Sequence, residues 1–284
     1  MTICPDLCAL NLTPAMERLD KLLAHEGFGS RKDIKKMMRA AEVLVNGKRT
    51  YDPGTQINPE KDTITVDGET VDLHGHIYLM MNKVMHTVSS NKDGEHQTVF
   101  DLLDDSLRTS YLEDKLHLVG RLDMDTEGLL LFTTDGELTH RLISPKSHIS
   151  KTYFCVLEHD ETVENQNHIK ELFAKGIEVG PEDNEAGFLC EPAELKWADE
   201  KAITKALKVS SFEAERSEYT ATTSNCALLK IYEGKYHQVK RMFTAVGNKV
   251  VFLKRVSMGS LQLDNSLKPG EYKFLEEEDL DKLN

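Results

Sequence analysis

Apolar residues recur at helical spacing near the start of the chain, and in short runs further along it. Leu19, Leu22 and Leu23 stand at positions i, i+3 and i+4, which predicts a helix with one buried face. Gly27-Phe28-Gly29 ends this helix, and Ser30 is a suitable N-cap for a second one. The apolar stripe expected on the second helix comprises Ile34, Met37, Met38 and Ala41.

Two short strand signals follow the second helix. Val43–Val45 precedes Asn46-Gly47, and a similar run ending at Val66 precedes Asp67-Gly68. Asn-Gly and Asp-Gly pairs favour the tight turns of β-hairpins because they tolerate positive φ. We therefore expect a small unit of two helices and short strands.

The longer remainder of the chain predicts a mixed sheet with helices. Its strand-like runs show no regular βαβ alternation and no internal repeat, and a helical stretch covers Asn167–Phe173. These runs are Ile77–Met81, Leu129–Thr133, Tyr153–Leu157 and Ala227–Ile231. The predicted organisation is an extension at 1–15, a small α/β unit at 16–74 and a larger α+β domain at 77–284.

The charge distribution keeps a nucleic-acid partner possible despite a net charge of −13. Residues 18–49 hold nine Lys and Arg against four acids, and residues 234–263 hold six against none. The acids concentrate at 158–200, with thirteen against three lysines, and we expect that stretch on a surface away from RNA. A positive face is sufficient for a polyanion, because screening limits each charge to about 10 Å. On charge alone, solvated helix faces explain the basic segments equally well.

Composition excludes several classes of protein. With 284 residues, 39% hydrophobic and 29% charged, the chain is neither disordered nor collagen-like. No apolar run approaches the length of a membrane span, and the N-terminus lacks the pattern of a secretory signal. Five cysteines, an odd number, argue against a disulfide framework and for a reducing, cytoplasmic compartment.

Familiar cofactor and metal motifs are missing from the sequence. Gly27-x-Gly29 lacks the third glycine of a dinucleotide loop, and neither Gly47-Lys48 nor Gly234-Lys235 completes a P-loop. Cys4 and Cys8 have no second ligand pair nearby, and His74-x-His76 is more simply a solvated pair. We therefore expect neither a cofactor nor a metal.

The first unit resembles the S4 RNA-binding domain. The resemblance covers residues 16 to about 73 and is carried by RLDKLLAHEGFGSRKDIKKMMRAAEVLVNGK at 18–48. It implies RNA binding, with the phosphate contacts on the second helix, where positive residues stacked at i, i+4 would otherwise repel one another. These expected contacts are Arg31, Lys32, Lys35 and Arg39.

An unusual group of acids precedes one apolar strand in the second unit. Asp123, Asp125 and Glu127 lie directly before or at the start of Leu129–Thr133, and Arg121 precedes them. A carboxylate at the mouth of a buried strand is rigid and partly desolvated, which suits a nucleophile or general base. The simpler interpretation, in which the acids cap turns, fits Asp125 and Asp135 but leaves Arg121 beside Asp123 unexplained.

This segment, GRLDMDTEGLLLFTTDG at 120–136, resembles the signature of pseudouridine synthases, in the branch that carries an S4 domain. The resemblance implies that Asp123 is the catalytic nucleophile, that Tyr153 of Lys151-Thr152-Tyr153 stacks on the target base, and that Lys240 pairs with Asp123. It extends from Met16 to about Leu275 and implies a mainly antiparallel catalytic sheet. The residues expected to contact RNA beside them are Arg121, Tyr236, His237 and Arg241.

Two further segments, THRLISPKSHISKTY and EGKYHQVKRMFTAVGN, look like those of family members that act on 16S rRNA. The expected activity is site-specific isomerisation of uridine, by a monomer, in 16S rRNA or a small-subunit assembly intermediate. A 23S rRNA enzyme and a non-catalytic ribosome assembly factor are the alternatives. One departure is the family's N-K-P-x-G turn, which reads Asn82-Lys83-Val84-Met85-His86 here and leaves the geometry of that loop open.

Overall fold

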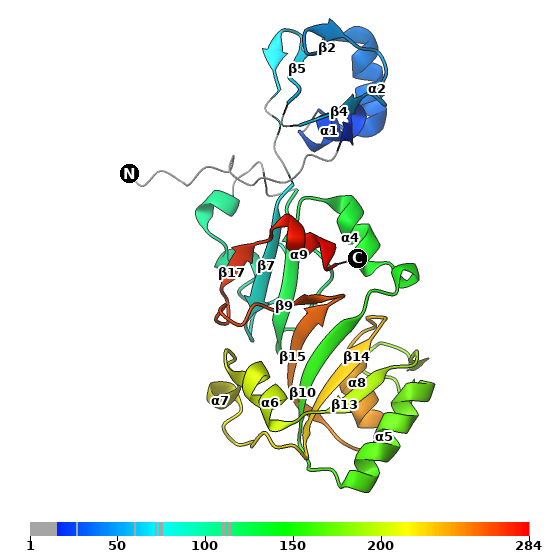
Figure 1. Ribbon diagram of the computed structural model, residues 1–284, viewed down its shortest axis with the longest axis vertical. Helices are drawn as coiled ribbons and strands as arrows, with labels where there is room; N and C mark the ends of the chain where they lie inside the picture. The colour runs from blue at the N-terminus through cyan, green and yellow to red at the C-terminus, as the bar shows by residue number, and fades with distance from the viewer. Residues whose placement is uncertain are drawn as a thin grey trace. The chain divides into compact units, whose positions relative to one another are not determined.

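The computed structural model describes residues 16–26, 28–59, 61–71, 73, 76–108, 112 and 115–283. The chain divides into two compact units, with the boundary between His76 and Ile77, and each unit is described by itself (Figure 1). No helix among the described residues is long and apolar enough to cross a bilayer. Cys4, Cys8 and His74 lie outside the described residues.

The first unit contains the two predicted helices and a small sheet. Helix α1 (Leu19–His25) precedes α2 (Arg31–Ala40), and β1 (Glu17–Arg18) pairs with β4 (Gln56–Ile57). The four-stranded sheet has the order β3-β2-β5-β6. Its strands are β2 (Val43–Val45), β3 (Lys48–Arg49), β5 (Ile64–Val66) and β6 (Glu69–Thr70).

Local signals explain where these elements begin and turn. The Ser30 hydroxyl accepts from the Asp33 N–H, and the Asp33 carboxylate accepts from the Ser30 N–H, so the predicted N-cap is a full capping box. Asn46 and Asp67 both have φ of 51° at the hairpin turns, as their following glycines require. Leu19, Leu22, Leu23, Ile34, Met38, Val43, Ile57, Ile64 and Val71 form the core of this unit.

A nine-stranded sheet forms the centre of the second unit, as far as the described residues show it. Its order is β13-β14-β10-β15-β9-β7-β17, with β16 added on β15 and β8 on β9. The described strand pairs of this sheet are antiparallel except β9 with β15, so the expected mixed, mainly antiparallel fold is confirmed. The strands are β7 (Tyr78–Lys83), β8 (His117–Leu118), β9 (Thr126–Thr133), β10 (Lys151–Leu157), β13 (Glu194–Trp197), β14 (Cys226–Ile231), β15 (Val250–Met258), β16 (Leu261–Gln262) and β17 (Tyr272–Phe274).

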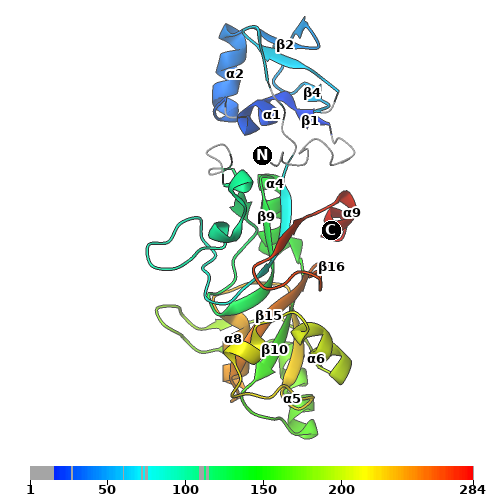
Figure 2. The same ribbon diagram turned by 90° about the vertical axis from the view of Figure 1, so that its left-hand side faces the viewer.

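Helices cover both faces of this sheet (Figures 1 and 2). One face packs against α5 (Val163–Lys175) and α8 (Gln238–Ala245) through Phe173 and Phe243. The other face packs against two pairs of helices, through Leu142 of the first pair and Phe212 of the second. These pairs are α4 (Gly136–Ile143) with α9 (Glu277–Asp281), and α6 (Glu200–Leu207) with α7 (Phe212–Glu215).

Alternation along the strands assigns side chains to the two faces. In β10, Tyr153 and Cys155 join the α5/α8 core, whereas Phe154 packs on the α6/α7 side. All eight residues of β9 are buried. Gly128 is necessary there, because a Cβ at this position would lie 2.2 Å from the Arg255 carbonyl of the parallel strand β15. The parallel pairing of β9 and β15 fixes the start of β9, directly after Asp123 and Asp125.

Smaller elements lie in the connections. The described part of the unit includes the 3₁₀ turns η2 (Phe100–Leu102), η3 (Asp105–Leu107) and η4 (Pro145–Ser147). The short strands β11 (Glu178–Val179) and β12 (Phe188–Leu189) form a hairpin in the acid-rich stretch. Cys155, Cys190 and Cys226 are free and buried.

Candidate active site

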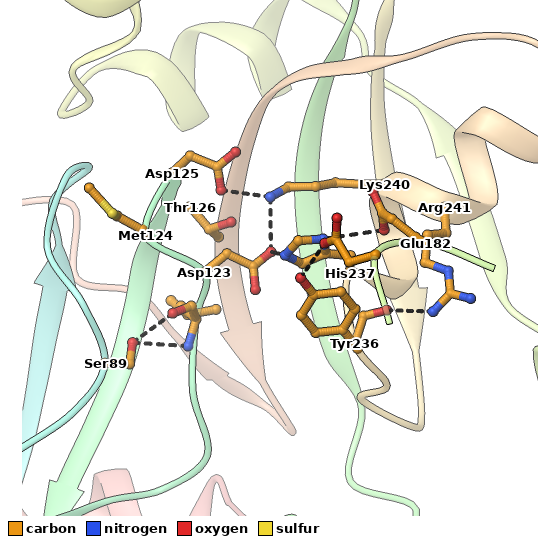
Figure 3. Close-up of polar contacts among 12 residues, drawn as sticks. Ser89, Asp123, Met124, Asp125, Thr126, Glu182, Tyr236, His237, Lys240 and Arg241 are labelled. Carbon is orange, nitrogen blue, oxygen red and sulfur yellow. Dashed lines mark hydrogen bonds and ion pairs between the residues drawn. The ribbon is translucent and has the colours of Figure 1, made fainter. Parts of the chain in front are cut away.

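Asp123 lies in the turn that connects β8 to β9, and the backbone of this turn is held from several directions. The Ser89 hydroxyl donates to the Leu122 carbonyl over 2.7 Å and accepts from the Leu122 N–H (Figure 3). The Thr126 N–H donates back to the Asp123 carbonyl, and the His86 N–H donates to the Met124 carbonyl. The turn is therefore fixed while the Asp123 carboxylate stays about one-third exposed.

Lys83 adds a buried cation beneath the same turn. Its ammonium donates to the carbonyls of Val84, Met124 and Thr126 at 3.1, 3.3 and 3.0 Å. The side chain is fully buried. Burial lowers the pKa of Lys83 to about 8, against the opposing charges of Asp125 and Asp123.

Lys240, on helix α8, reaches the carboxylates that the turn presents. Its Nζ lies 2.9 Å from Asp123 Oδ2 and 2.6 Å from Asp125 Oδ1 (Figure 3). Burial alone would lower the pKa of Lys240, but the two carboxylates outweigh it and raise that pKa. The lysine is therefore charged at neutral pH and forms an ion pair with each carboxylate.

The simpler interpretation, in which the acids cap turns, does not account for the main contact of Asp125. Its carboxylate pairs with Lys240, and although burial raises its pKa, the hydrogen bond and charge of Lys240 leave that pKa below the ordinary value. Asp135, by contrast, does cap a helix, since its carboxylate accepts from the N–H groups of Glu137 and Leu138 at the start of α4.

A cavity of about 370 Å³ opens beside Asp123. Tyr153 from β10 lines it with only 8% of its surface exposed, and the exposed Arg121 lines it together with His237. This volume lies in the range of pockets that hold small ligands. The structure thus brings Asp123, Tyr153 and Lys240, separated along the chain, to one place.

The acid-rich stretch 158–200 departs from its expected position on a remote surface. Glu182 Oε2 lies 3.2 Å from His237 Nδ1, and the Tyr236 hydroxyl donates to Asp183 over 2.8 Å. Glu191 lines the cavity. Local charge counts could not reveal this, because only the tertiary fold returns these few acids to the site.

Arg241 also departs from its expected role as an RNA contact. Its guanidinium is 4% exposed and donates to the carbonyls of Gly180, Ala186 and Tyr236. It also lies 4.4 Å from the Phe188 ring centroid. These bonds hold the β11–β12 hairpin against α8, so the charge is not presented to a phosphate.

The other expected RNA contacts are accessible. Tyr236 is 40% exposed and stacks on the His237 ring at a centroid distance of 3.8 Å. On α2 of the first unit, Arg31, Lys32, Lys35 and Arg39 are all exposed. Arg31, Lys35 and Arg39 are spaced at i, i+4 and form one basic stripe on that helix.

The open question about the loop after β7 has a structural answer. His86, at the position of the glycine in the family's N-K-P-x-G turn, has φ of +63°. This left-handed conformation favours glycine, and histidine is among the residues that adopt it more readily than most. The turn is therefore kept without glycine, and the His86 N–H still supports Met124.

Comparison with known proteins identifies the class to which this site belongs. The family model for RNA pseudouridylate synthase matches residues 77–245, and the S4 domain model matches residues 17–64. The chain belongs to the RNA pseudouridylate synthase family and carries an S4 domain. It is therefore an isomerase of uridine in RNA.

Individual relatives extend the match over almost the whole chain. An uncharacterised RNA pseudouridine synthase, YtzG of Bacillus subtilis (strain 168), is 42% identical over 94% of this chain and 98% of its own. Ribosomal small subunit pseudouridine synthase A of Escherichia coli (strain K12) is 36% identical over 93% of this chain and 98% of its own. A crystal structure of a pseudouridylate synthase, 35% identical, superposes with a TM-score of 0.58 over 94% of this chain and 99% of that one.

Proposed function

We propose that this enzyme isomerises one uridine of small-subunit, 16S, ribosomal RNA, as free RNA or within an assembly intermediate. Support comes from relatives named ribosomal small subunit pseudouridine synthase A, which are 36–38% identical over 93% of this chain. The basic stripe of α2 adds a surface suited to RNA phosphates.

Asp123 is the proposed nucleophile, and its pairing with Lys240 beside the cavity is the observation that carries this assignment. The reaction breaks the N1–C1′ bond and joins C5 to C1′, while one proton leaves C5 and one is gained at N1. It needs an ionised carboxylate near the sugar or base, as in retaining glycosidases. The ion pair with Lys240 fixes the direction of Asp123 Oδ2.

Tyr153 and Arg121 act on the RNA in this proposal. The uridine must leave its stack before Asp123 can reach it. The Tyr153 ring at the cavity wall then offers a stacking face, worth about 1–3 kcal/mol per base. The exposed Arg121 beside it binds the phosphate or fills the space the base vacates.

The test compares Asp123→Asn with the wild type on 16S rRNA and on small-subunit particles. We expect loss of pseudouridine formation, with RNA affinity retained because the fold and basic surfaces are unchanged. Asp125→Asn is the matched control. It removes one partner of Lys240 but leaves the Lys240–Asp123 contact, so we expect it to retain measurable turnover.

Mapping the modified nucleotide in a strain that lacks this gene decides the substrate. A missing pseudouridine in 16S rRNA supports the proposal, whereas a missing one in 23S rRNA overturns it. If Asp123→Asn protein rescued every phenotype of the deletion, the chain would act as an assembly factor through binding alone.

A further inference from the structure

His237 and Glu182 form a carboxylate–imidazole pair beside the proposed nucleophile. His237 Nδ1 lies 3.2 Å from Glu182 Oε2, and its Nε2 lies 3.8 Å from Asp123 Oδ2 (Figure 3). The imidazole lines the same cavity as Tyr153 and is 23% exposed. Nothing in the proposed roles of Asp123, Lys240 and Tyr153 uses this pair.

The carboxylate determines which ring nitrogen is free. An ionised Glu182 can only accept, so Nδ1 of His237 carries the proton and donates it. In the neutral ring, Nε2 then has an available lone pair. At 3.8 Å from Asp123, Nε2 is too far away for a hydrogen bond to that carboxylate, and His237 lines the cavity beside it.

The position of Glu182 is built into the fold. The buried Arg241 ties both ends of the 180–186 loop to α8 by donating to the carbonyls of Gly180 and Ala186. Asp183 accepts from Tyr236, whose ring stacks on His237 with an interplanar angle of 21°. The imidazole is thus oriented by the loop on one side and by a stacked ring on the other.

The reaction needs a group in this place. After C5 bonds to C1′, the C5–H bond must break so that its electron pair restores the C5=C6 double bond, and N1 must gain a proton. Lys240 is charged and cannot accept a proton. We propose that His237 Nε2 takes the C5 proton and returns it to N1, with Glu182 as the positioning residue. This inference rests on the proposed function.

Distances support that assignment. A nucleophilic oxygen meets its target atom at about 3–3.5 Å. Whether Asp123 acts at C1′, at C6 or on a sugar proton, C5 must reach C1′ close to the same carboxylate. An imidazole nitrogen 3.8 Å from that oxygen therefore lies within reach of the C5 proton.

The test measures turnover on RNA whose uridines carry either hydrogen or deuterium at C5. For His237→Gln we expect a fall in kcat of about 100-fold, the lower range for loss of a general base. The deuterium isotope effect should also become larger than in the wild type, because proton removal becomes rate-limiting. A slower enzyme with an unchanged isotope effect would assign His237 a structural role and overturn the inference, as would unchanged turnover.

Three further variants test the role of Glu182 and the need for the imidazole of His237. Glu182→Gln should lower kcat by a smaller factor than His237→Gln and should also raise the isotope effect. Glu185→Gln is the matched control, because it removes the same charge from the same hairpin, and it should change neither kcat nor the isotope effect. His237→Gly suits the φ of +48° at this position, and added imidazole should restore part of its turnover.

Tyr153 is the rival proton acceptor. If Tyr153→Phe enlarges the isotope effect and His237→Gln does not, the tyrosine carries the proton and the inference fails. Either result leaves the Asp123→Asn test of the proposed function untouched, because that variant is expected to block the reaction before C5 loses its proton.

Discussion

Lys83→Met offers a direct test of how the active turn is held. The substitution preserves side-chain length but removes the donor to the Val84, Met124 and Thr126 carbonyls. Met124 and Thr126 flank Asp125 and follow Asp123, so their release lets the nucleophile shift. Because a misplacement of about 1 Å can cost about 100-fold in rate, we expect a fall in kcat of that order.

Stability should respond differently from activity. Burial lowers the pKa of Lys83 to about 8 in the folded chain, from an ordinary value of 10.5. Because the pKa is lowered, keeping Lys83 charged below pH 8 destabilises the folded state. At about 1.36 kcal/mol for each pH unit, this destabilisation is about 3 kcal/mol. The cost is relieved as pH rises from 8 to 10.5, where the unfolded chain binds more protons.

At neutral pH, loss of the hydrogen bonds and relief of this cost oppose each other in Lys83→Met. We therefore expect the free energy of unfolding to change by less than about 2 kcal/mol while kcat falls. The part of the rise in stability between pH 8 and 10.5 that comes from Lys83 should disappear. Denaturant unfolding at a series of pH values measures the free energy of unfolding and its dependence on pH.

The pH profile of activity gives the decisive readout. When Lys83 loses its proton, the neutral amine has only two N–H donors for three carbonyls. We therefore expect the kcat of the wild type to decline at alkaline pH, with a midpoint near pH 8. This alkaline limb should be absent from the pH profile of Lys83→Met. Lys254→Met is the matched control. Burial also lowers the pKa of Lys254 to about 8, but its ammonium donates to the carbonyls of Ala206 and Val209, away from the turn. If Lys83→Met kept wild-type turnover or the same alkaline limb, the turn would be held by other contacts.

Two further predictions concern the loop after β7 and the S4 domain. His86→Ala should lower the free energy of unfolding by about 1 kcal/mol, since alanine disfavours φ of +63°, and His86→Gly should recover part of it in the same denaturant assay. Equal losses for alanine and glycine would instead assign the stability to the His86–Glu215 contact, which both variants remove. Lys35→Ala with Arg39→Ala should weaken RNA binding and reduce the slope of log K against log salt by about 2. An unchanged slope would mean that this stripe faces only water.

Local pattern was sufficient for part of each unit, where the signals are short-range, but it did not predict elements such as β15 and α8. Leucine spacing predicted α1, Ser30 predicted the start of α2, and the Asn46 and Asp67 turns are set by adjacent residues. The long apolar run predicted β9, although its first residues, including Gly128, carry no strand signal. Their strand conformation comes from pairing with β15, which is remote in sequence.

The meeting of Asp123 with Lys240 could not be obtained from periodicity. These residues are 117 positions apart, and only the resemblance to a family suggested the pair before the structure placed the ammonium and carboxylate in contact. Sequence order also misassigned Arg241. Successive residues on a helix point about 100° apart, so Lys240 can face the carboxylates while Arg241 turns inward to the hairpin.

The polar groups around Asp123 divide into two sets with different roles. Lys83, Ser89 and the His86 N–H bind only backbone groups of the turn or its neighbours, so they fix its position without neutralising a side chain. Lys240 and His237 instead face the Asp123 carboxylate, at 2.9 and 3.8 Å. Because the backbone is held by buried or local donors, the groups at the carboxylate can exchange protons or meet RNA without loosening the turn. A fully buried lysine thus supports the turn from below, whereas Asp123, Lys240 and His237 remain partly exposed.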